Sequence, residues 1–275
     1  MGPQELFAEL VSRPDEQVDL ARSALLIAQA EYSDLDSERY LMRLDELGRS
    51  VGRRLLPTGR LEDARTALNR LLYEDEGFRG NTRDYYDPRN SFLNEVLDRR
   101  IGIPISLSAV YIEVARRAGV TVEGVSLPGH FVVRLVGPEG ALLVDPFHSG
   151  MRLTEADCQR RLDRIYDGKM KLDGAMLATC GPRAMLARML RNLKVIYVKR
   201  GDLRRALRVV EMLLLTVPEA TEELRDRGLL HGALDCYAWA ARDLEAYLEG
   251  CPGAKDKAAV QAKIADMGRK AALLN

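Results

Sequence analysis

Apolar residues recur at every third or fourth position in three segments of the first 75 residues. This spacing places the apolar side chains on one face of a helix, so it predicts an amphipathic helix in each segment. The segments cover residues 15–30, 37–51 and 61–73, and the sequence Pro57-Thr58-Gly59 interrupts the pattern between the last two. We expect residues 1–75 to form a helical N-terminal subdomain.

A more apolar helix is predicted after the polar, tyrosine-containing loop at 74–90. Residues 105–118 are apolar on nearly every face, which is typical of a helix buried at the centre of its domain. Pro104 stands at its first position and Gly119 follows its end, the usual places of these two residue types around a helix. A shorter amphipathic helix is predicted at 92–99.

Three short runs rich in valine and leucine follow this central helix, at 120–126, 131–136 and 141–144. Only short turns containing proline and glycine separate them, which favours antiparallel strands. The predicted fold class is therefore α+β. We expect residues 76–182 to form a core domain in which the central helix packs against a small antiparallel sheet.

Residues 183–275 are predicted to be helical, and they contain an internal repeat. Three residues recur 34 positions later: Ala206 as Ala240, Leu214 as Leu248 and Pro218 as Pro252. This period and its alanine and proline positions resemble those of tetratricopeptide repeats. The resemblance implies an all-α C-terminal domain whose stacked helices bind a protein partner.

The composition argues against several classes of partner. Lysine plus arginine and aspartate plus glutamate both number 41, so no net field draws the chain to nucleic acid or to an anionic membrane. No apolar run approaches the ~20 residues that span a bilayer, and no signal peptide is evident at the first residues. Four widely spaced cysteines form no Cys-x-x-Cys pair, which favours reduced thiols. We expect a cytoplasmic protein that binds neither nucleic acid nor membrane.

Candidate chemistry lies on the predicted strands. His130 precedes the second strand and Asp145 ends the third, and neighbouring antiparallel strands would bring the two together. A helix that points its N-terminus at such a pair is the arrangement of cysteine-nucleophile hydrolases. The chain has no cysteine before Cys158, and Ser106 is the hydroxyl nearest the helix start. A serine is a weak substitute for a thiol, and Ser106 is better explained by a hydrogen bond to the preceding turn.

Other interpretations of the same residues stay open at this stage. His130 also suits a hydrogen bond to a carbonyl of the Leu-Pro-Gly-His-Phe turn, and Asp145 before Pro146 suits a turn. With His148 the two residues suggest a metal site, but no further strong ligand has evident spacing, so we expect no metal. No glycine-rich phosphate loop is present, and we expect no cofactor.

The segments NSFLNEVLDRRIGIPISLS, RRAGV, PGHF and DPF between residues 90 and 147 resemble the transglutaminase-like domain of the SirB1 family, and the repeats resemble its tetratricopeptide tail. The resemblance implies a cysteine at the helix start, a histidine on the next strand and an aspartate on the one after. His130 and Asp145 match the last two positions. The cysteine position falls at or near Pro104, two residues before Ser106.

Two functions follow from these features. The first is a non-catalytic scaffold, a pseudoenzyme that binds a protein or peptide partner through its repeats and through a groove in the core domain. The residues expected to line that groove are Tyr85, Tyr86, Asn90, Asn94, Pro104, Phe131 and Phe147. The alternative is a hydrolase or acyl-transferase that uses Ser106 with His130 and Asp145.

Overall fold

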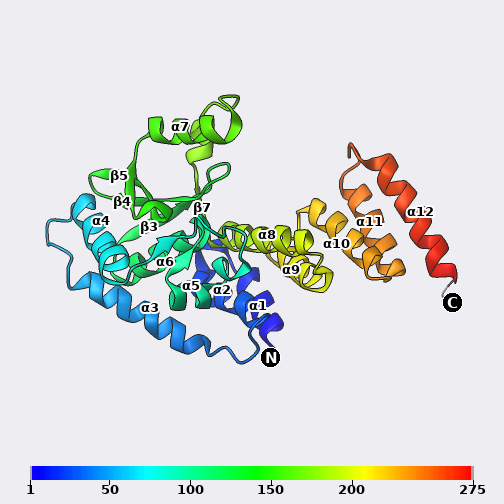
Figure 1. Ribbon diagram of the computed structural model, residues 1–275, viewed down its shortest axis with the longest axis horizontal. Helices are drawn as coiled ribbons and strands as arrows, with labels where there is room; N and C mark the ends of the chain where they lie inside the picture. Colours follow the sequence, from blue (N-terminus) through cyan, green and yellow to red (C-terminus); the bar gives the residue numbers. More distant parts are fainter. Residues whose placement is uncertain (1, 274–275) are drawn as a thin grey trace. The chain divides into compact units, whose positions relative to one another are not determined.

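The computed structural model describes residues 2–273 and divides the chain into two compact units, one ending at Met189 and the other beginning at Leu190 (Figure 1). The helices predicted for residues 1–75 and the predicted sheet belong to the same unit. The sheet domain therefore includes the N-terminal helices as part of its packing.

Seven α-helices are described in the first unit. They are α1 (Pro3–Ser12), α2 (Leu20–Gln29), α3 (Ser37–Gly52), α4 (Leu61–Asn69), α5 (Leu93–Arg99), α6 (Pro104–Arg117) and α7 (Glu155–Tyr166). The helix predicted at 15–30 is divided, because Asp19 accepts a hydrogen bond from the amide of Arg22 and so caps α2 after a 3₁₀ turn. The helix predicted at 61–73 continues beyond α4 as a π-helical turn at Arg70–Asp75.

A five-stranded antiparallel sheet has the order β6-β5-β4-β3-β7. Its strands are β3 (Thr121–Val125), β4 (Val132–Gly137), β5 (Gly140–Asp145), β6 (Met151–Leu153) and β7 (Thr179–Cys180). The three predicted strands are confirmed as β3, β4 and β5, which are joined by short turns. The edge strands β6 and β7 are too short to leave a period-two pattern in the sequence. A separate parallel pair joins β1 (Arg79–Gly80) to β2 (Ile101–Gly102).

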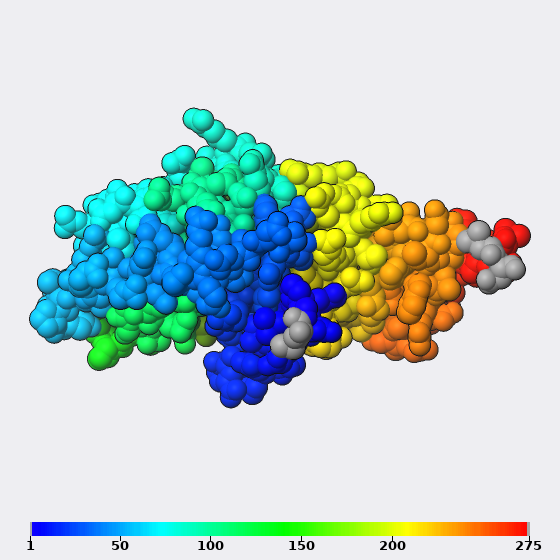
Figure 2. Space-filling view, turned by 90° about the horizontal axis from the view of Figure 1, so that it is seen from below, coloured from blue at the N-terminus to red at the C-terminus, as the bar shows by residue number. Residues whose placement is uncertain are grey.

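The sheet lies between α6 on one face and α7 on the other (Figure 1). Every residue of α6 from Pro104 to Ala115 is buried, which confirms it as the central helix. On the other face, Cys158 of α7 packs with Val125 and Val132 of the sheet. Helices α1 to α3, in blue, cover much of the face of this unit seen in Figure 2. The end of β5 and the start of β4 are therefore held between packed helices.

The secondary-structure elements described in the second unit are all helices. Its helices are α9 (Leu203–Thr216), α10 (Thr221–Ala233), α11 (Tyr237–Gly250) and α12 (Lys257–Leu273), preceded by α8 (Pro182–Arg200), which spans the boundary between the units. Helices α9 and α11 begin and end 34 residues apart, and Ala206 and Ala240 are both fully buried. The predicted repeat is confirmed. Among residues 2–273, no helix is both long enough and apolar enough to cross a membrane.

The packing of α3 on α6 depends on a glycine. A Cβ atom on Gly48 would lie 2.3 Å from the Cβ of Arg117, and the Arg117 backbone also lies close. We expect Gly48→Ala to lower the free energy of unfolding by about 2 kcal/mol, because the two helices would have to separate. Urea denaturation followed by circular dichroism measures the change.

Gly52→Ala is the matched control on the same helix, since a Cβ atom there would meet no atom within 4 Å. We expect this variant to be neutral or stabilised by up to about 1 kcal/mol, as alanine favours the helix over glycine. Equal stabilities of the two variants would contradict the close approach of α3 to α6.

Candidate functional site

The site is built around the carboxylate of Asp145, which is fully buried at the end of β5. Its Oδ1 accepts hydrogen bonds from the amides of Phe147 (3.0 Å) and His148 (3.3 Å). Asp145 thereby caps the 3₁₀ turn η4 (Pro146–His148), and Pro146 occupies the first position of that turn, where no amide is needed. The local sequence Asp-Pro-Phe-His thus orients the carboxylate and brings His148 back towards it.

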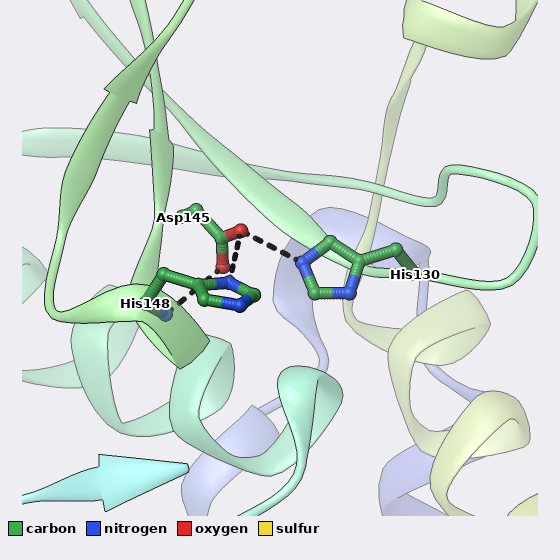
Figure 3. A group of neighbouring side chains, drawn as sticks. All are labelled: His130, Asp145 and His148. Atoms are coloured by element: carbon green, nitrogen blue, oxygen red, sulfur yellow. Dashed lines mark hydrogen bonds and ion pairs between the residues drawn. The ribbon is translucent and has the colours of Figure 1, made fainter. Parts of the chain in front are cut away.

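Three side chains converge on the other oxygen of this carboxylate, Oδ2. Figure 3 shows the rings of His130 and His148 directed at Asp145. His130 Nε2 lies 2.9 Å from Oδ2 and His148 Nδ1 lies 2.8 Å from it. Arg161 of α7 donates from Nη2 to the same oxygen at 2.7 Å. The predicted proximity of His130 and Asp145 follows from the pairing of β4 with β5.

The surroundings of Asp145 and His130 shift the pKa values of both side chains. Burial alone would raise the pKa of Asp145, but the hydrogen bonds from His130 and His148 and the charge of Arg161 hold that pKa well below its usual range. Burial lowers the pKa of His130 by disfavouring the imidazolium, although the hydrogen bond to Asp145 opposes this shift. At neutral pH the site therefore contains an ionised carboxylate beside a neutral, buried imidazole.

Ser106 does not take part in this cluster. Its hydroxyl donates to the carbonyl of Asn90 at 2.6 Å and accepts from the amide of Ile103 at 3.0 Å. It is fully buried in the first turn of α6, where it satisfies a backbone group that the helix leaves free. Of the three predicted catalytic residues, the structure joins His130 and Asp145 by a hydrogen bond and ties Ser106 to backbone groups near the helix start.

Comparison with known proteins identifies the family. A family model described as the transglutaminase-like superfamily matches residues 38–191, and a tetratricopeptide repeat model matches 193–265. A UPF0162 protein of Xylella fastidiosa strain 9a5c is 37% identical over 268 residues, which are 96% of this chain and 95% of that protein. The chain belongs to the UPF0162 family of transglutaminase-like proteins.

Other relatives cover the chain to different extents. A UPF0162 protein of Pseudomonas aeruginosa is 31% identical over 245 residues, 89% of this chain and 88% of that protein. F-box only protein 21 of Mus musculus is 36% identical over 143 residues, 49% of this chain and 22% of that protein. The predicted combination of a transglutaminase-like domain with tetratricopeptide repeats is confirmed by the two family models.

The residues predicted to line a groove divide into two groups in this UPF0162 chain. Four of them are buried: Asn90, Asn94, Pro104 and Phe131. The Asn90 side chain donates to the carbonyl of Asp84 at 2.7 Å and so fixes the loop instead of facing a ligand. A buried side chain offers no surface to a partner, so the candidate surface is reduced to the other three residues.

Those three residues, Tyr85, Tyr86 and Phe147, form what we call the aromatic patch. Tyr86 is 55% exposed and Tyr85 is 38% exposed, and their ring centroids lie 5.4 Å apart. Phe147 stacks edge-on between Tyr85 (6.5 Å) and His130 (6.1 Å). The patch therefore runs from the surface to the His130–Asp145 pair.

Arg161 is a site residue that the sequence did not indicate. It lies 16 positions after Asp145 on α7, beyond the three predicted strands. Its approach depends on the packing of Cys158 beneath the sheet, which no local pattern reveals. His148 is a close neighbour of Asp145 in sequence, and the 3₁₀ turn places its ring on the carboxylate.

Removing the charge of Asp145 tests how much this carboxylate contributes to the stability of the first unit. In Asp145→Asn, an amide N–H or a weaker acceptor would face His130, His148 and the guanidinium of Arg161. We expect a loss of about 3 kcal/mol in the free energy of unfolding of the first unit, because breaking a buried ion pair leaves its partner uncompensated. Denaturant titration of the full chain measures it.

Asp75→Asn is the control, since Asp75 pairs with Arg54 on the surface of the same unit. We expect this change to cost less than about 1 kcal/mol. A similar cost for both variants would show that the contacts of Asp145 add nothing beyond those of an exposed ion pair.

Proposed function

We propose that this UPF0162 protein is a non-catalytic scaffold that binds a protein or peptide partner. The observation that carries the proposal is the position of the Ser106 hydroxyl, which is buried and hydrogen-bonded to Asn90 and Ile103 at the start of α6. The family arrangement needs a nucleophile at this helix start, beside the histidine. Here those positions hold Pro104, Ile105 and Ser106, whose hydroxyl is hydrogen-bonded to backbone groups.

The thiols of the transglutaminase-like unit do not supply the nucleophile either. Cys158 is buried under the sheet, and burial raises its pKa. Burial also raises the pKa of Cys180 to about 11. A reactive cysteine needs a lowered pKa, because the thiolate is the attacking species. The hydrolase or acyl-transferase alternative would therefore depend on Ser106 alone.

Binding is supported by an apolar depression in the helical repeats. A cavity of ≈ 440 Å³ lies among α8, α9 and α10 and is lined mainly by aliphatic side chains. Val195, Val198 and Leu229 in its lining are each more than a third exposed. Exposed apolar side chains gathered around a depression are typical of a surface that receives a partner's apolar side chains.

The aromatic patch is the second candidate contact. Tyr85 and Tyr86 offer large, stiff rings with polar tips, a residue type enriched in protein interfaces. We propose that a partner segment contacts this patch while the repeats hold a second segment. The function thus becomes recognition of a protein through two surfaces of one chain.

Ser106→Ala tests whether this serine serves structure. We expect a loss of about 2 kcal/mol in the free energy of unfolding, because the Ile103 amide and the Asn90 carbonyl lose a buried partner. Ser108→Ala is the matched control two residues along the same helix. The Ser108 hydroxyl is buried and has no hydrogen-bond partner among the described residues, so its removal should be neutral or stabilising.

The same pair of variants tests the alternative function. A fluorophosphonate probe reports an activated serine, and we expect it to leave the wild-type chain unlabelled. Labelling of wild type and Ser108→Ala, with none of Ser106→Ala, would overturn the scaffold proposal in favour of a hydrolase.

Partner binding is tested at the depression in the repeats. We expect Leu229→Glu to reduce capture of partner proteins from a lysate at least about tenfold, because a carboxylate would be desolvated at the contact. Leu215→Glu is the control: Leu215 and Leu229 are each 36% exposed, and Leu215 does not line this depression. Quantitative mass spectrometry of the captured proteins compares the variants. Equal losses with both, or with neither, would count against this surface.

A further inference from the structure

We propose that His130, Asp145 and His148 form a binding site for a divalent transition-metal ion of the Zn²⁺ type, which displaces the guanidinium of Arg161. The three donors are of the types that Zn²⁺ prefers, two imidazole nitrogens and a carboxylate oxygen. Their ligand atoms all lie within 4.8 Å of one another. The inference goes beyond partner binding and reverses the expectation from sequence that no metal is held.

The distances from the two imidazole nitrogens to the Asp145 carboxylate are near those that a bound ion needs. Donors at about 2.0–2.2 Å from Zn²⁺ stand about 3.4 Å apart in a tetrahedral arrangement. His130 Nε2 and His148 Nδ1 lie 2.9 Å and 2.8 Å from Asp145 Oδ2. Each imidazole nitrogen therefore has to move away from Asp145 Oδ2 by about half an ångström to admit the ion.

The present contacts overload one oxygen atom. Asp145 Oδ2 has two lone pairs, yet three groups lie within hydrogen-bonding distance: His130, His148 and Arg161. A metal ion relieves this crowding, because each imidazole would then offer a lone pair to the ion in place of an N–H to the carboxylate. The protons of the two N–H groups need not be lost, since each neutral ring carries its proton on the other nitrogen once the ion is bound.

Hydrogen bonds and paired strands already hold two of the proposed ligands, Asp145 and His130, in position. Oδ1 of Asp145 is held by the amides of Phe147 and His148, so Oδ2 keeps its direction towards the histidines. His130 and Asp145 lie at the adjoining ends of the paired strands β4 and β5. Ligands on rigid, hydrogen-bonded elements are pre-organised for binding.

Arg161 marks the place of a cation. Its Nη2 lies 2.7 Å from Asp145 Oδ2 and 3.4 Å from His148 Nδ1, so a positive charge already occupies the space between two of the proposed ligands. Helix α7 is anchored by Cys158 and Leu162, whereas the long Arg161 arm can rotate without moving the helix. Its withdrawal leaves one carboxylate and two imidazoles, a site of net charge −1 for a divalent ion.

The site is also reachable from solvent. The His148 side chain is 46% exposed, whereas Asp145 is fully buried. An ion would enter past His148 and keep at least one coordination position for water, since the chain supplies three ligands.

A Zn²⁺-binding test is simple to interpret because the chain has few histidines. It has three histidines, and the third, His231, lies in the helical repeats on α10. Zn²⁺ binding to the full-length, reduced chain without an affinity tag is measured by calorimetry, and Co²⁺ absorption in the visible range reports the coordination geometry. We expect one ion per wild-type chain. His148→Gln should weaken binding at least about tenfold, and His231→Gln should leave it unchanged.

Arg161→Gln is an independent test, because it leaves all three ligands in place and removes the competing positive charge. We expect it to bind Zn²⁺ ~10-fold more tightly than wild type. The proposal is overturned if the wild-type chain binds no Zn²⁺, if His148→Gln binds as well as wild type, or if Arg161→Gln binds more weakly. These results are independent of whether a partner binds the repeats, so failure here leaves the scaffold proposal standing.

Discussion

A buried, ionised carboxylate is the constraint on which the rest of this domain depends. Asp145 lies between packed layers where an unpaired charge would cost several kcal/mol, so each of its oxygens must receive donors. The donors come from the 3₁₀ turn, the segment before β4, and α7. One side chain therefore ties together the sheet, the turn after it and the helix beneath it, and the ends of β4 and β5 cannot shift independently.

The sequence predicts those contacts of this arrangement that join residues close together in the chain. Strands β4 and β5 are joined by a tight turn, so the hydrophobic runs predict that His130 and Asp145 lie near each other. The 34-residue repeat is equally local, because each helix pair repeats the same contacts. The position of Arg161 cannot be predicted in this way. Its place depends on how α7 packs under the sheet, and helical periodicity gives the face of a helix but not its position.

Polar residues near the helix start were the least predictable. Asn90 and Ser106 have the polarity expected of a binding groove or a catalytic serine, and both are buried. Their hydrogen bonds run to backbone groups, with Asn90 holding Asp84 and Ser106 holding Asn90 itself. A side chain that satisfies a backbone carbonyl has the same sequence signature as one that faces a ligand. Only the fold distinguishes them, since the partner of Ser106 is 16 residues earlier in the chain.

The cluster also gives the His–Asp pair a structural role that does not depend on a nucleophile. In an enzyme the carboxylate orients the imidazole and the imidazole activates the attacking group, so each member depends on the next. Here Asp145 is fully engaged by donors that include Arg161 and two backbone amides. Replacing His130 would remove one of five contacts and leave the carboxylate partly satisfied, whereas replacing Asp145 would release all of them. The pair thus contributes to the packing of the domain, and its presence alone carries no requirement for catalysis.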